Sequence, residues 1–442
     1  MPNYFIKTLG CQMNKNDSER IAGFLRSLGM KQSESPKQAD LIIINTCSVR
    51  QSAEDRVFGL VRNWKELRKS NPNLVISITG CMAGCDQAGK LKARLKVVDL
   101  LFKIDELDKL AKYLRSRGFV VNNGCSEPRQ SNNEYLNIAP IRDNKFHSFI
   151  TIQIGCNNFC SYCVVPYARG REYNRPVSEI LREVKESVES GVIAITLLGQ
   201  VINHYKAPDK ENFSLNNPFL QDDFAALLWE VNQIDGLQRI HFTAPHPLYF
   251  SELQIQALCL PKQTNYLHLP VQSGDNDILK KMNRKHTVEQ YIDLIDKIKK
   301  ARPGIALGTD LIVGFPGESE QQFQNTIKLY KKCEFDISYT AMYSPRSNTV
   351  ADKAFDDDVL KTEKRKRWMV LQELMEQMTL KKNQKYVGME LAVMVEKHKN
   401  GMCFGQSPDM KLVEFKGSKS NVGKMVKVKI NEAGMWILRG KM

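Results

Sequence analysis

Three cysteines lie close together near the middle of the chain in the spacing C-x-x-x-C-x-x-C: Cys156, Cys160 and Cys163. A protein-bound four-iron cluster normally takes four thiolates, so three thiolates leave one iron with an open position that a small chelating molecule can fill. A structural zinc site usually has paired C-x-x-C elements or histidine partners, and no such pair follows this run. The spacing therefore favours a [4Fe-4S] cluster with one exchangeable position.

A second set of three cysteines is spread over the first part of the chain: Cys11, Cys47 and Cys81. Each lies just beyond a short apolar run that is typical of a buried strand. Since the carboxyl ends of parallel strands meet at one edge of a sheet, we expect these thiols to converge and to hold a second three-cysteine cluster. Cys85 competes for the same role, but it lies inside the segment after Cys81 and ranks lower.

The composition is that of an ordinary globular protein with reduced thiols. Hydrophobic residues make up 42% of the 442 residues, and no apolar run approaches the roughly 20 residues of a membrane span. The first residues lack the pattern of a signal peptide, and an odd total of 11 cysteines argues against a disulfide framework. We therefore expect a cytoplasmic protein with no membrane partner.

Strand-like and helix-like segments alternate at the start of the chain, which predicts an open α/β domain over residues 1–120. Strands are expected over residues 4–9, 41–45, 74–78 and 97–102. The runs at 41–45 and 74–78 are continuously apolar, as in buried parallel sheets. Residues 122–144 are rich in Asn, Ser and Pro and have no periodicity. They indicate a linker.

Six further strand candidates follow the linker, separated by helical patterns: residues 149–154, 193–198, 239–243, 266–269, 307–313 and 336–342. Consecutive units of this kind predict an open or partial (β/α)6 barrel over residues 142–375. The functional face of such a barrel lies at the carboxyl ends of its strands.

The last part of the chain is short-stranded and basic. A basic helix is expected over 363–385, then strands at 391–395, 411–415, 425–430 and 434–438, which predict a small antiparallel β-barrel of about five strands over residues 378–442. From residue 361 onward there are 18 Lys and Arg residues against 8 Asp and Glu, out of a net charge of +15 for the whole chain. This concentration of positive charge favours a nucleic-acid partner.

Three motifs resemble those of the methylthiotransferases, a branch of the radical S-adenosylmethionine (SAM) enzymes. They are Gly10-Cys-Gln-Met-Asn-Lys-Asn-Asp-Ser-Glu, Gly155-Cys-Asn-Asn-Phe-Cys-Ser-Tyr-Cys-Val-Val-Pro-Tyr-Ala-Arg-Gly-Arg-Glu and His268-Leu-Pro-Val-Gln-Ser-Gly. The resemblance covers essentially the whole chain. It implies an N-terminal cluster domain, a radical SAM barrel and a C-terminal RNA-binding β-barrel of the TRAM type.

The resemblance also implies a reaction and its cofactors, which are two [4Fe-4S] clusters and SAM in two roles. The cluster of the barrel would pass an electron from a low-potential donor to SAM, and a second SAM would supply a methyl group to sulfur on the first-domain cluster. Within the branch, the motifs are most similar to members that add a methylthio group at C2 of an isopentenylated adenosine at position 37 of tRNA.

Five residues near strand ends of the barrel are expected to contact SAM, in part because their segments resemble those of the family: Gln200, Gln272, Ser273, Asp310 and Glu318. The chain departs from the family at Val201, which stands where an Asn is usual. We therefore assign no SAM contact to Val201.

Three arginines follow the cysteine run of the barrel: Arg169, Arg171 and Arg175. Beside a site for a polyanion, guanidinium groups favour phosphate contacts. We expect these arginines to bind tRNA.

Two other interpretations of the function stay open. Related enzymes of the same architecture act on threonylcarbamoyl adenosine in tRNA or on an aspartate of a ribosomal protein, and the chain could also be a non-catalytic RNA-binding iron–sulfur protein. Reductive cleavage of SAM to 5′-deoxyadenosine separates the enzymes from a binding protein.

Overall fold

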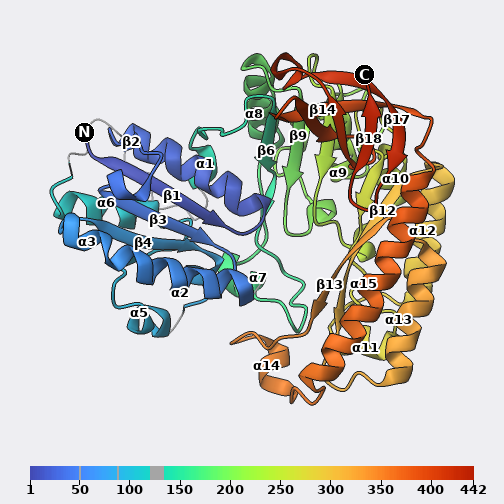
Figure 1. Ribbon diagram of the computed structural model, residues 1–442, viewed down its shortest axis with the longest axis horizontal. Helices are drawn as coiled ribbons and strands as arrows, with labels where there is room; N and C mark the ends of the chain where they lie inside the picture. The colour runs from blue at the N-terminus through green and yellow to red at the C-terminus, as the bar shows by residue number, and fades with distance from the viewer. Residues whose placement is uncertain (49–50, 87–88, 120–133) are drawn as a thin grey trace.

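The computed structural model of the chain describes residues 1–48, 51–86, 89–119 and 134–442. Three consecutive groups of elements follow one another along the chain: an α/β sheet, an open barrel of parallel strands and a closed β-barrel (Figure 1). This architecture confirms the predicted fold class, except that one strand pair of the closed barrel is parallel and not antiparallel. Most of the predicted linker lies outside the described residues, and the exact domain bounds stay a prediction.

The first domain is a parallel five-stranded sheet of order β2-β1-β3-β4-β5. Its strands are β1 (Asn3–Leu9), β2 (Lys31–Gln32), β3 (Leu41–Thr46), β4 (Val75–Gly80) and β5 (Leu100–Leu101). Its helices are α1 (Gln12–Ser27), α2 (Gln51–Lys65), α3 (Leu67–Ser70), α4 (Cys81–Gly84), α5 (Lys90–Arg94) and α6 (Leu107–Ser116). Strands β3 and β4 are buried along their whole length.

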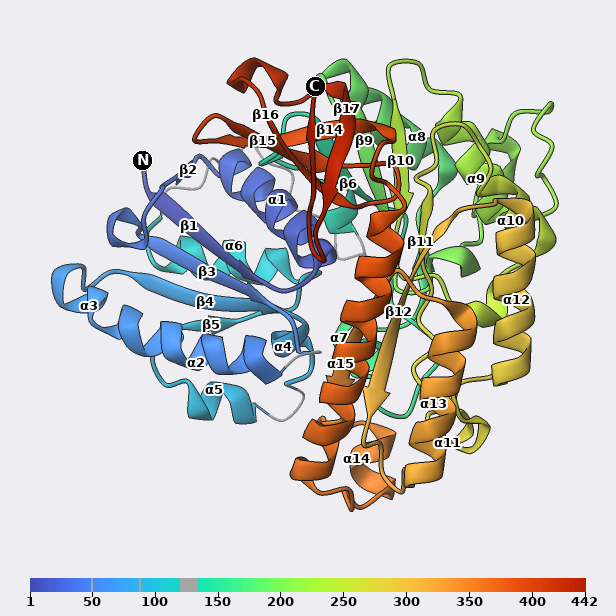
Figure 2. The same cartoon turned by 45° about the vertical axis from the view of Figure 1, so that its right-hand side comes forward.

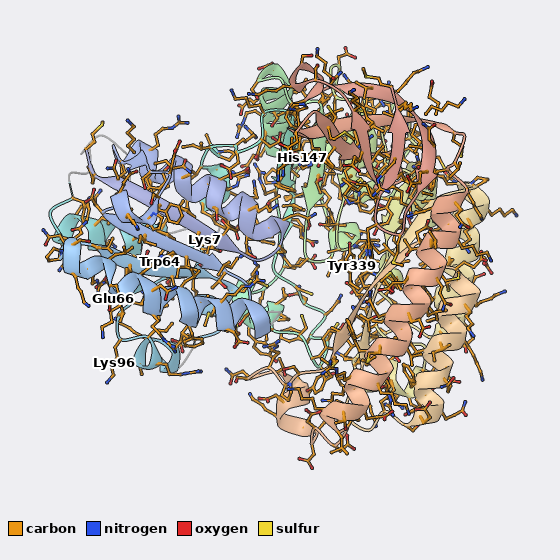
Figure 3. All side chains as sticks on the ribbon, in the orientation of Figure 1. Lys7, Trp64, Glu66, Lys96, His147 and Tyr339 are labelled. Atoms are coloured by element: carbon orange, nitrogen blue, oxygen red, sulfur yellow. The ribbon has the colours of Figure 1, made fainter. Side chains whose placement is uncertain are left out.

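Helices cover both faces of this sheet, which explains why its central strands are apolar without alternation. Helices α1 and α6 pack on one face, where Ile21 and Leu110 meet Ile43. Helix α2 packs on the other face through Val57 and Trp64 (Figure 3 labels Trp64).

The central domain is a partial barrel of two three-stranded parallel halves, β10-β9-β6 and β11-β12-β13. Its strands are β6 (His147–Thr151), β9 (Ala194–Leu198), β10 (Arg239–Phe242), β11 (Tyr266–His268), β12 (Ala306–Val313) and β13 (Ile337–Met342). Its helices are α7 (Val165–Arg169), α8 (Val177–Glu189), α9 (Asp223–Asn232), α10 (Glu252–Ala257), α11 (Asn276–Lys281), α12 (Val288–Ala301), α13 (Glu320–Cys333), α14 (Val350–Ala354) and α15 (Lys361–Gln384). A parallel bridge between Ile240 and Gln263 joins the two halves.

The six predicted strands are therefore confirmed, with a shift at the first. The run expected over 149–154 divides into β6 and β7 (Gln153–Ile154), and β7 turns away to pair with β8 (Tyr173–Asn174) in the antiparallel sense. This small hairpin encloses the loop that carries the three cysteines of the barrel.

The C-terminal domain is a closed barrel of order β14-β15-β16-β18-β17. Its strands are β14 (Glu390–Lys399), β15 (Met402–Gln406), β16 (Leu412–Lys416), β17 (Met425–Ala433) and β18 (Leu438–Lys441). Alternate residues such as Val393, Val413 and Val428 fill its interior. The predicted helix and α15 agree closely, so the expected boundary at 375–378 falls inside a continuous helix.

Buried polar contacts hold the first domain against the barrel. Arg20 on α1 donates from Nη2 to both carboxylate oxygens of Glu183 on α8, at 2.8 and 2.9 Å. Asn16 on α1 donates to the carbonyl oxygen of Phe149 on β6 at 3.0 Å. Because α1 begins beside Cys11, these contacts also fix that cysteine relative to the barrel strands.

The C-terminal barrel packs on the amino ends of central strands, as the turned view in Figure 2 shows. Arg239, the first residue of β10, donates to the carbonyl oxygen of Gln406 at 2.9 Å. The backbone N–H of Asn265, just before β11, donates to the carbonyl oxygen of Pro408 at 2.8 Å. The three domains therefore meet around the interior of the central barrel.

Candidate cluster and cofactor sites

The first-domain cysteines lie together at the carboxyl edge of the sheet, as predicted. Strand register places Leu9 beside Thr46 and Thr46 beside Gly80, so the residues that follow these strands are neighbours. Cys11 precedes α1, and Cys81 begins α4 directly after β4. Gly80 has φ of +88°, and a Cβ atom there would lie 2.4 Å from the carbonyl oxygen of Thr46, so only glycine fits this turn.

The three thiols also interact. A Cβ atom added at Gly10 would lie 3.0 Å from the Cβ of Cys47. A hydrogen bond from Cys47, together with Arg169, lowers the pKa of the Cys81 thiol to about 6. Burial raises the pKa of Cys11, which also feels the charge of Cys81. The donor set therefore fits a cluster with three thiolate ligands, one of which is already close to its ionised form.

Cys85 lies one turn beyond Cys81, at the end of α4, and not at the strand edge. Burial, with the neighbouring Cys81 and Glu54, raises the pKa of Cys85 to about 12. A thiol that resists ionisation is the poorer ligand. The lower rank of Cys85 as a cluster ligand stays a prediction.

The barrel cysteines lie on a loop that the protein anchors at several points. The backbone N–H of Ser161 donates to the carbonyl oxygen of Met282 at 3.0 Å, and the Asn283 side chain donates to two carbonyl oxygens of the loop. Arg284 lies against Cys160, with Nη1 to Sγ at 3.8 Å. The loop thus presents Cys156, Cys160 and Cys163 with a buried cation beside them.

In the described ranges, no three His, Cys, Asp or Glu side chains are grouped to hold a single metal ion. A four-iron cluster needs a different arrangement, because each thiolate binds its own iron. Burial raises the pKa of Cys156 and that of Cys163, the latter to about 12. Iron binding would deprotonate both thiols.

Several buried polar atoms of this loop and of segments that follow β9 and α11 have no hydrogen-bond partner within the part of the chain that the structure describes. They are Asn158 Nδ2, Gln200 Oε1, Arg284 Nε and both ring nitrogens of His286. Buried polar groups are rarely unpaired, so these atoms fit a polar ligand at the carboxyl ends of the strands. Burial and Arg284 lower the pKa of His286 to about 3, so the ring is neutral and can accept a hydrogen bond.

The sequence did not single out Arg284 and His286. Both follow α11 and lie far along the chain from the cysteine loop, to which only the fold brings them. No spacing in the sequence signals that approach.

Four of the five predicted SAM contacts lie at or near the carboxyl ends of strands. Gln200 has its unpaired oxygen there, and Gln272 has a left-handed backbone with φ of +77°. Ser273 is fully buried and accepts from the backbone N–H of Asp275. Asp310 lies half exposed on β12, 3.1 Å from His268 Nε2. Their contact with SAM stays a prediction.

Glu318 needs a correction, because its carboxylate is already committed. It accepts from the backbone N–H of Gly314 at 2.6 Å and forms a buried ion pair with Arg367 at 2.8 Å. Its side chain is 1% exposed. Glu318 therefore holds the loop after β12 against α15 through Oε2, and the burial of its side chain disfavours a contact with SAM.

Two of the three arginines expected to bind tRNA also need correction. Arg175 is buried, donates to the carbonyl oxygen of Thr151 and pairs with Glu183 at 2.6 Å. Arg169 is buried against Asp17 at 2.6 Å. Neither guanidinium faces solvent, whereas Arg171 is exposed and stays a predicted phosphate contact.

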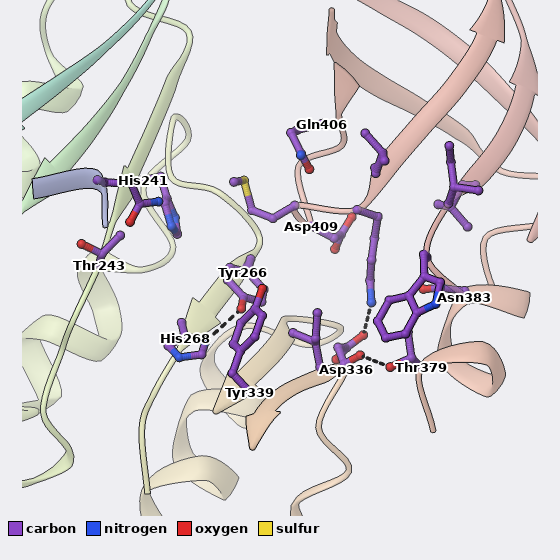
Figure 4. Close-up of a pocket in the computed structure, with 18 of the residues that line it drawn as sticks. His241, Thr243, Tyr266, His268, Asp336, Tyr339, Thr379, Asn383, Gln406 and Asp409 are labelled. Atoms are coloured by element: carbon purple, nitrogen blue, oxygen red, sulfur yellow. Dashed lines mark hydrogen bonds and ion pairs between the residues drawn. The ribbon is translucent and has the colours of Figure 1, made fainter. Parts of the chain in front are cut away.

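A cavity of about 710 Å³ opens where the three domains meet (Figure 4). Cys11 lines it from the first domain, His268 and Tyr339 line it from the barrel, and Trp436 lines it from the C-terminal domain. Tyr339 and Trp436 are both exposed. The edge of the first-domain cysteine site and the interior of the barrel therefore open into the same cavity.

Polar groups along this cavity are ordered by their neighbours. Tyr266 and His268 are joined by a 3.1 Å hydrogen bond, which Figure 4 draws. Asp336 forms an ion pair with Lys411 of the C-terminal domain at 3.0 Å. The wall of the cavity can thus meet a ligand that is both aromatic and polar.

No described helix combines the length and the apolar character that crossing a membrane requires.

Comparisons with known proteins divide the chain in the same way. Residues 150–330 match the radical SAM superfamily, residues 3–103 match an uncharacterized protein family, UPF0004, and residues 384–442 match the TRAM domain. Among solved structures, a radical SAM methyltransferase, TsrM, from Kitasatospora setae with cobalamin and a [4Fe-4S] cluster bound aligns with a TM-score of 0.53. It is 13% identical, over 91% of this chain and 81% of that chain, which shows a shared fold.

Curated relatives match almost from end to end. Proteins named tRNA-2-methylthio-N(6)-dimethylallyladenosine synthase are 41% identical in Clostridium tetani, over 99% of this chain and 96% of the relative, and 40% identical in Thermoanaerobacter sp., over 99% and 92%. Identity of this extent, together with the two cysteine sets and the three matched domains, settles the family. The chain belongs to the methylthiotransferase family of radical SAM enzymes.

Proposed function

We propose that this protein inserts a methylthio group at C2 of N6-(dimethylallyl)adenosine at position 37 of tRNA. The observation that carries the proposal is the cavity that Cys11, the barrel interior and the C-terminal domain share. A nucleotide in this cavity would lie beside the first-domain thiols and above the barrel strands. The names of relatives at 40–41% identity support the same substrate.

The chemistry requires cofactors, because adenine C2–H is an unactivated bond that no side-chain acid or base can substitute. When bound, two [4Fe-4S] clusters and SAM supply the radical, the sulfur and the methyl group. Cys156, Cys160 and Cys163 would hold one cluster, and Cys11, Cys47 and Cys81 would hold the other.

The protein's own side chains bind and orient. Gln200 and His286 would take the polar groups of SAM, since their buried polar atoms have no other partner among the described residues. Tyr339 and Trp436 present exposed rings on which a base can stack. The loop contacts around Ser161 keep the barrel cysteines rigid.

The C-terminal domain and its helix would supply affinity for tRNA through their net positive charge, with Arg171 as a further phosphate contact. The chemistry requires a low-potential electron donor for the barrel cluster, and a tRNA substrate is consistent with a reaction in the cytoplasm. Threonylcarbamoyl adenosine and a ribosomal-protein aspartate are the alternative substrates. No feature of the cavity favours either of them.

Mass spectrometry of tRNA nucleosides tests the proposal. The anaerobically reconstituted protein, with SAM and a reductant, is incubated with three forms of one anticodon stem-loop that differ at adenosine 37: isopentenylated, threonylcarbamoylated and unmodified. We expect a methylthio group only on the isopentenylated form. Modification of the threonylcarbamoylated form instead, or of none, would contradict the proposed substrate.

A further inference from the structure

Helix α7 connects the two cysteine sites. It begins at Val165, two residues after Cys163, and ends at Arg169. A Cβ atom added at Gly84 would lie 2.2 Å from the carbonyl oxygen of Ala168, so α7 packs directly on α4, which begins at Cys81. Figure 2 shows these two short helices side by side. The end of α7, which belongs to the barrel domain, therefore lies at the first-domain cysteine site.

The last residue of α7 is Arg169, which lies at this site. Its side chain is 5% exposed, and its Nη2 lies 2.6 Å from Asp17 Oδ2, whose side chain is 1% exposed. After the larger effect of Cys47, the charge of Arg169 lowers the pKa of the Cys81 thiol, and it opposes the rise in the pKa of Cys11 that burial causes, so the guanidinium lies near both thiols. Arg169 therefore lies between a carboxylate of α1 and two of the three first-domain thiols.

Asp17 alone does not satisfy this buried cation. Within the described residues, Arg169 Nη1, Asp17 Oδ1 and the hydroxyl of Tyr135 are buried without a hydrogen-bond partner. Tyr135 also interacts electrostatically with Arg169. Burying a guanidinium is costly unless its N–H groups are paired. An unpaired buried donor beside the first-domain thiols therefore fits an acceptor that arrives with the cofactor.

We propose that Arg169 is a positioning residue for the first-domain cluster, and that it donates to a sulfur of that cluster. The proposal rests on the assignment of a cluster to Cys11, Cys47 and Cys81 under the proposed function. The cluster becomes more negative when it takes one electron from an external reductant, while the guanidinium keeps its proton. A fixed neighbouring cation favours that reduced form, and hydrogen bonds to sulfur have the same effect.

The test is a redox titration followed by electron paramagnetic resonance. It uses the full-length chain with Cys156, Cys160 and Cys163 replaced by Ala, so that only the first-domain cluster is titrated. We expect Arg169→Gln to shift the one-electron equilibrium toward the oxidised cluster about tenfold, which corresponds to about 59 mV. Arg169→Lys, which keeps the charge without the planar fork, should shift it less.

Two further variants separate this role from simple packing. Asp17→Asn removes the counter-charge of Arg169 and should shift the potential in the opposite direction, which loss of packing would not do. Arg171→Gln, at an exposed arginine two residues away, should leave the potential unchanged.

An Arg169→Gln protein with full iron content and the parent potential would overturn the proposal. If Arg169→Gln does not retain its cluster, Asp17→Asn decides: a raised potential supports the proposal, and an unchanged one overturns it. A parent protein that holds no iron would overturn this inference together with the cluster assignment. Failure to modify tRNA would leave these potentials unaffected, because the titration contains no tRNA.

Discussion

Cys81→Ala is expected to reduce methylthio insertion to background while reductive cleavage of SAM continues. Cys81 begins α4 at the edge of the first sheet and hydrogen-bonds with Cys47, so its loss removes one of three thiolates there. Only an ionised thiol binds iron well. The barrel loop keeps all three of its own cysteines. One assay measures 5′-deoxyadenosine and the methylthiolated nucleoside in the same tube.

Matched cysteine variants make this result specific. Cys160→Ala should abolish both products, because it removes a thiolate from the barrel cluster that cleaves SAM. Cys85→Ala should change neither product greatly, since Cys85 lies beyond the strand edge. A Cys81→Ala enzyme that still makes the modified base, or a Cys85→Ala enzyme that cannot, would refute this assignment of ligands.

Glu183→Ala is expected to destabilise the protein by about 3–5 kcal/mol, the usual cost of leaving buried charges without their partner. Glu183 pairs with Arg20 of the first domain at 2.8 Å and with Arg175 at 2.6 Å, and all three side chains are buried. The change removes the buried carboxylate that the two guanidinium groups share, and Arg175 keeps a longer ion pair, with Glu179 at 3.5 Å. Urea denaturation of the anaerobic holoprotein measures the effect.

A carboxylate on the same helix provides the control. Glu186 is exposed and lies 3.9 Å from Arg182, so Glu186→Ala should cost at most about 1 kcal/mol. Equal midpoints for the two variants would show that the buried network does not stabilise the domain interface.

The same network predicts a pH dependence. Burial opposes ionisation of Glu183, but Arg20 and Arg175 hold its pKa below the ordinary value. A lowered pKa in the folded state stabilises the protein above the unfolded-state pKa, and the stabilisation is lost as pH falls through the folded value. The difference in stability between the parent and Glu183→Ala should therefore shrink on acidification.

Local patterns in the sequence were sufficient to predict the strands and the positions that follow them. Apolar runs marked β3 and β4, and the rule that parallel strands share a carboxyl edge placed Cys47 and Cys81 together. The same rule placed Gln200 and Gln272 near the barrel site. Strand β15 was not among the predicted runs.

Charged residues were harder to place, because their partners lie far away in the sequence. Arg169 pairs with Asp17 across 152 positions, and Glu318 pairs with Arg367 across 49. From the sequence alone, a basic residue after a cluster loop is as compatible with a contact to a phosphate group as with a buried ion pair. Only the docking of α7 on α4 shows that Arg169 lies in the first-domain site.

The iron content of the anaerobically reconstituted protein tests the central claim most directly, which is that two separate three-cysteine sites each hold a cluster. We expect about eight irons per chain in the intact protein and about four after Cys156, Cys160 and Cys163 are replaced together. Further replacement of Cys11, Cys47 and Cys81 should remove the rest. An intact protein with about four irons, all lost with the barrel cysteines, would contradict the account.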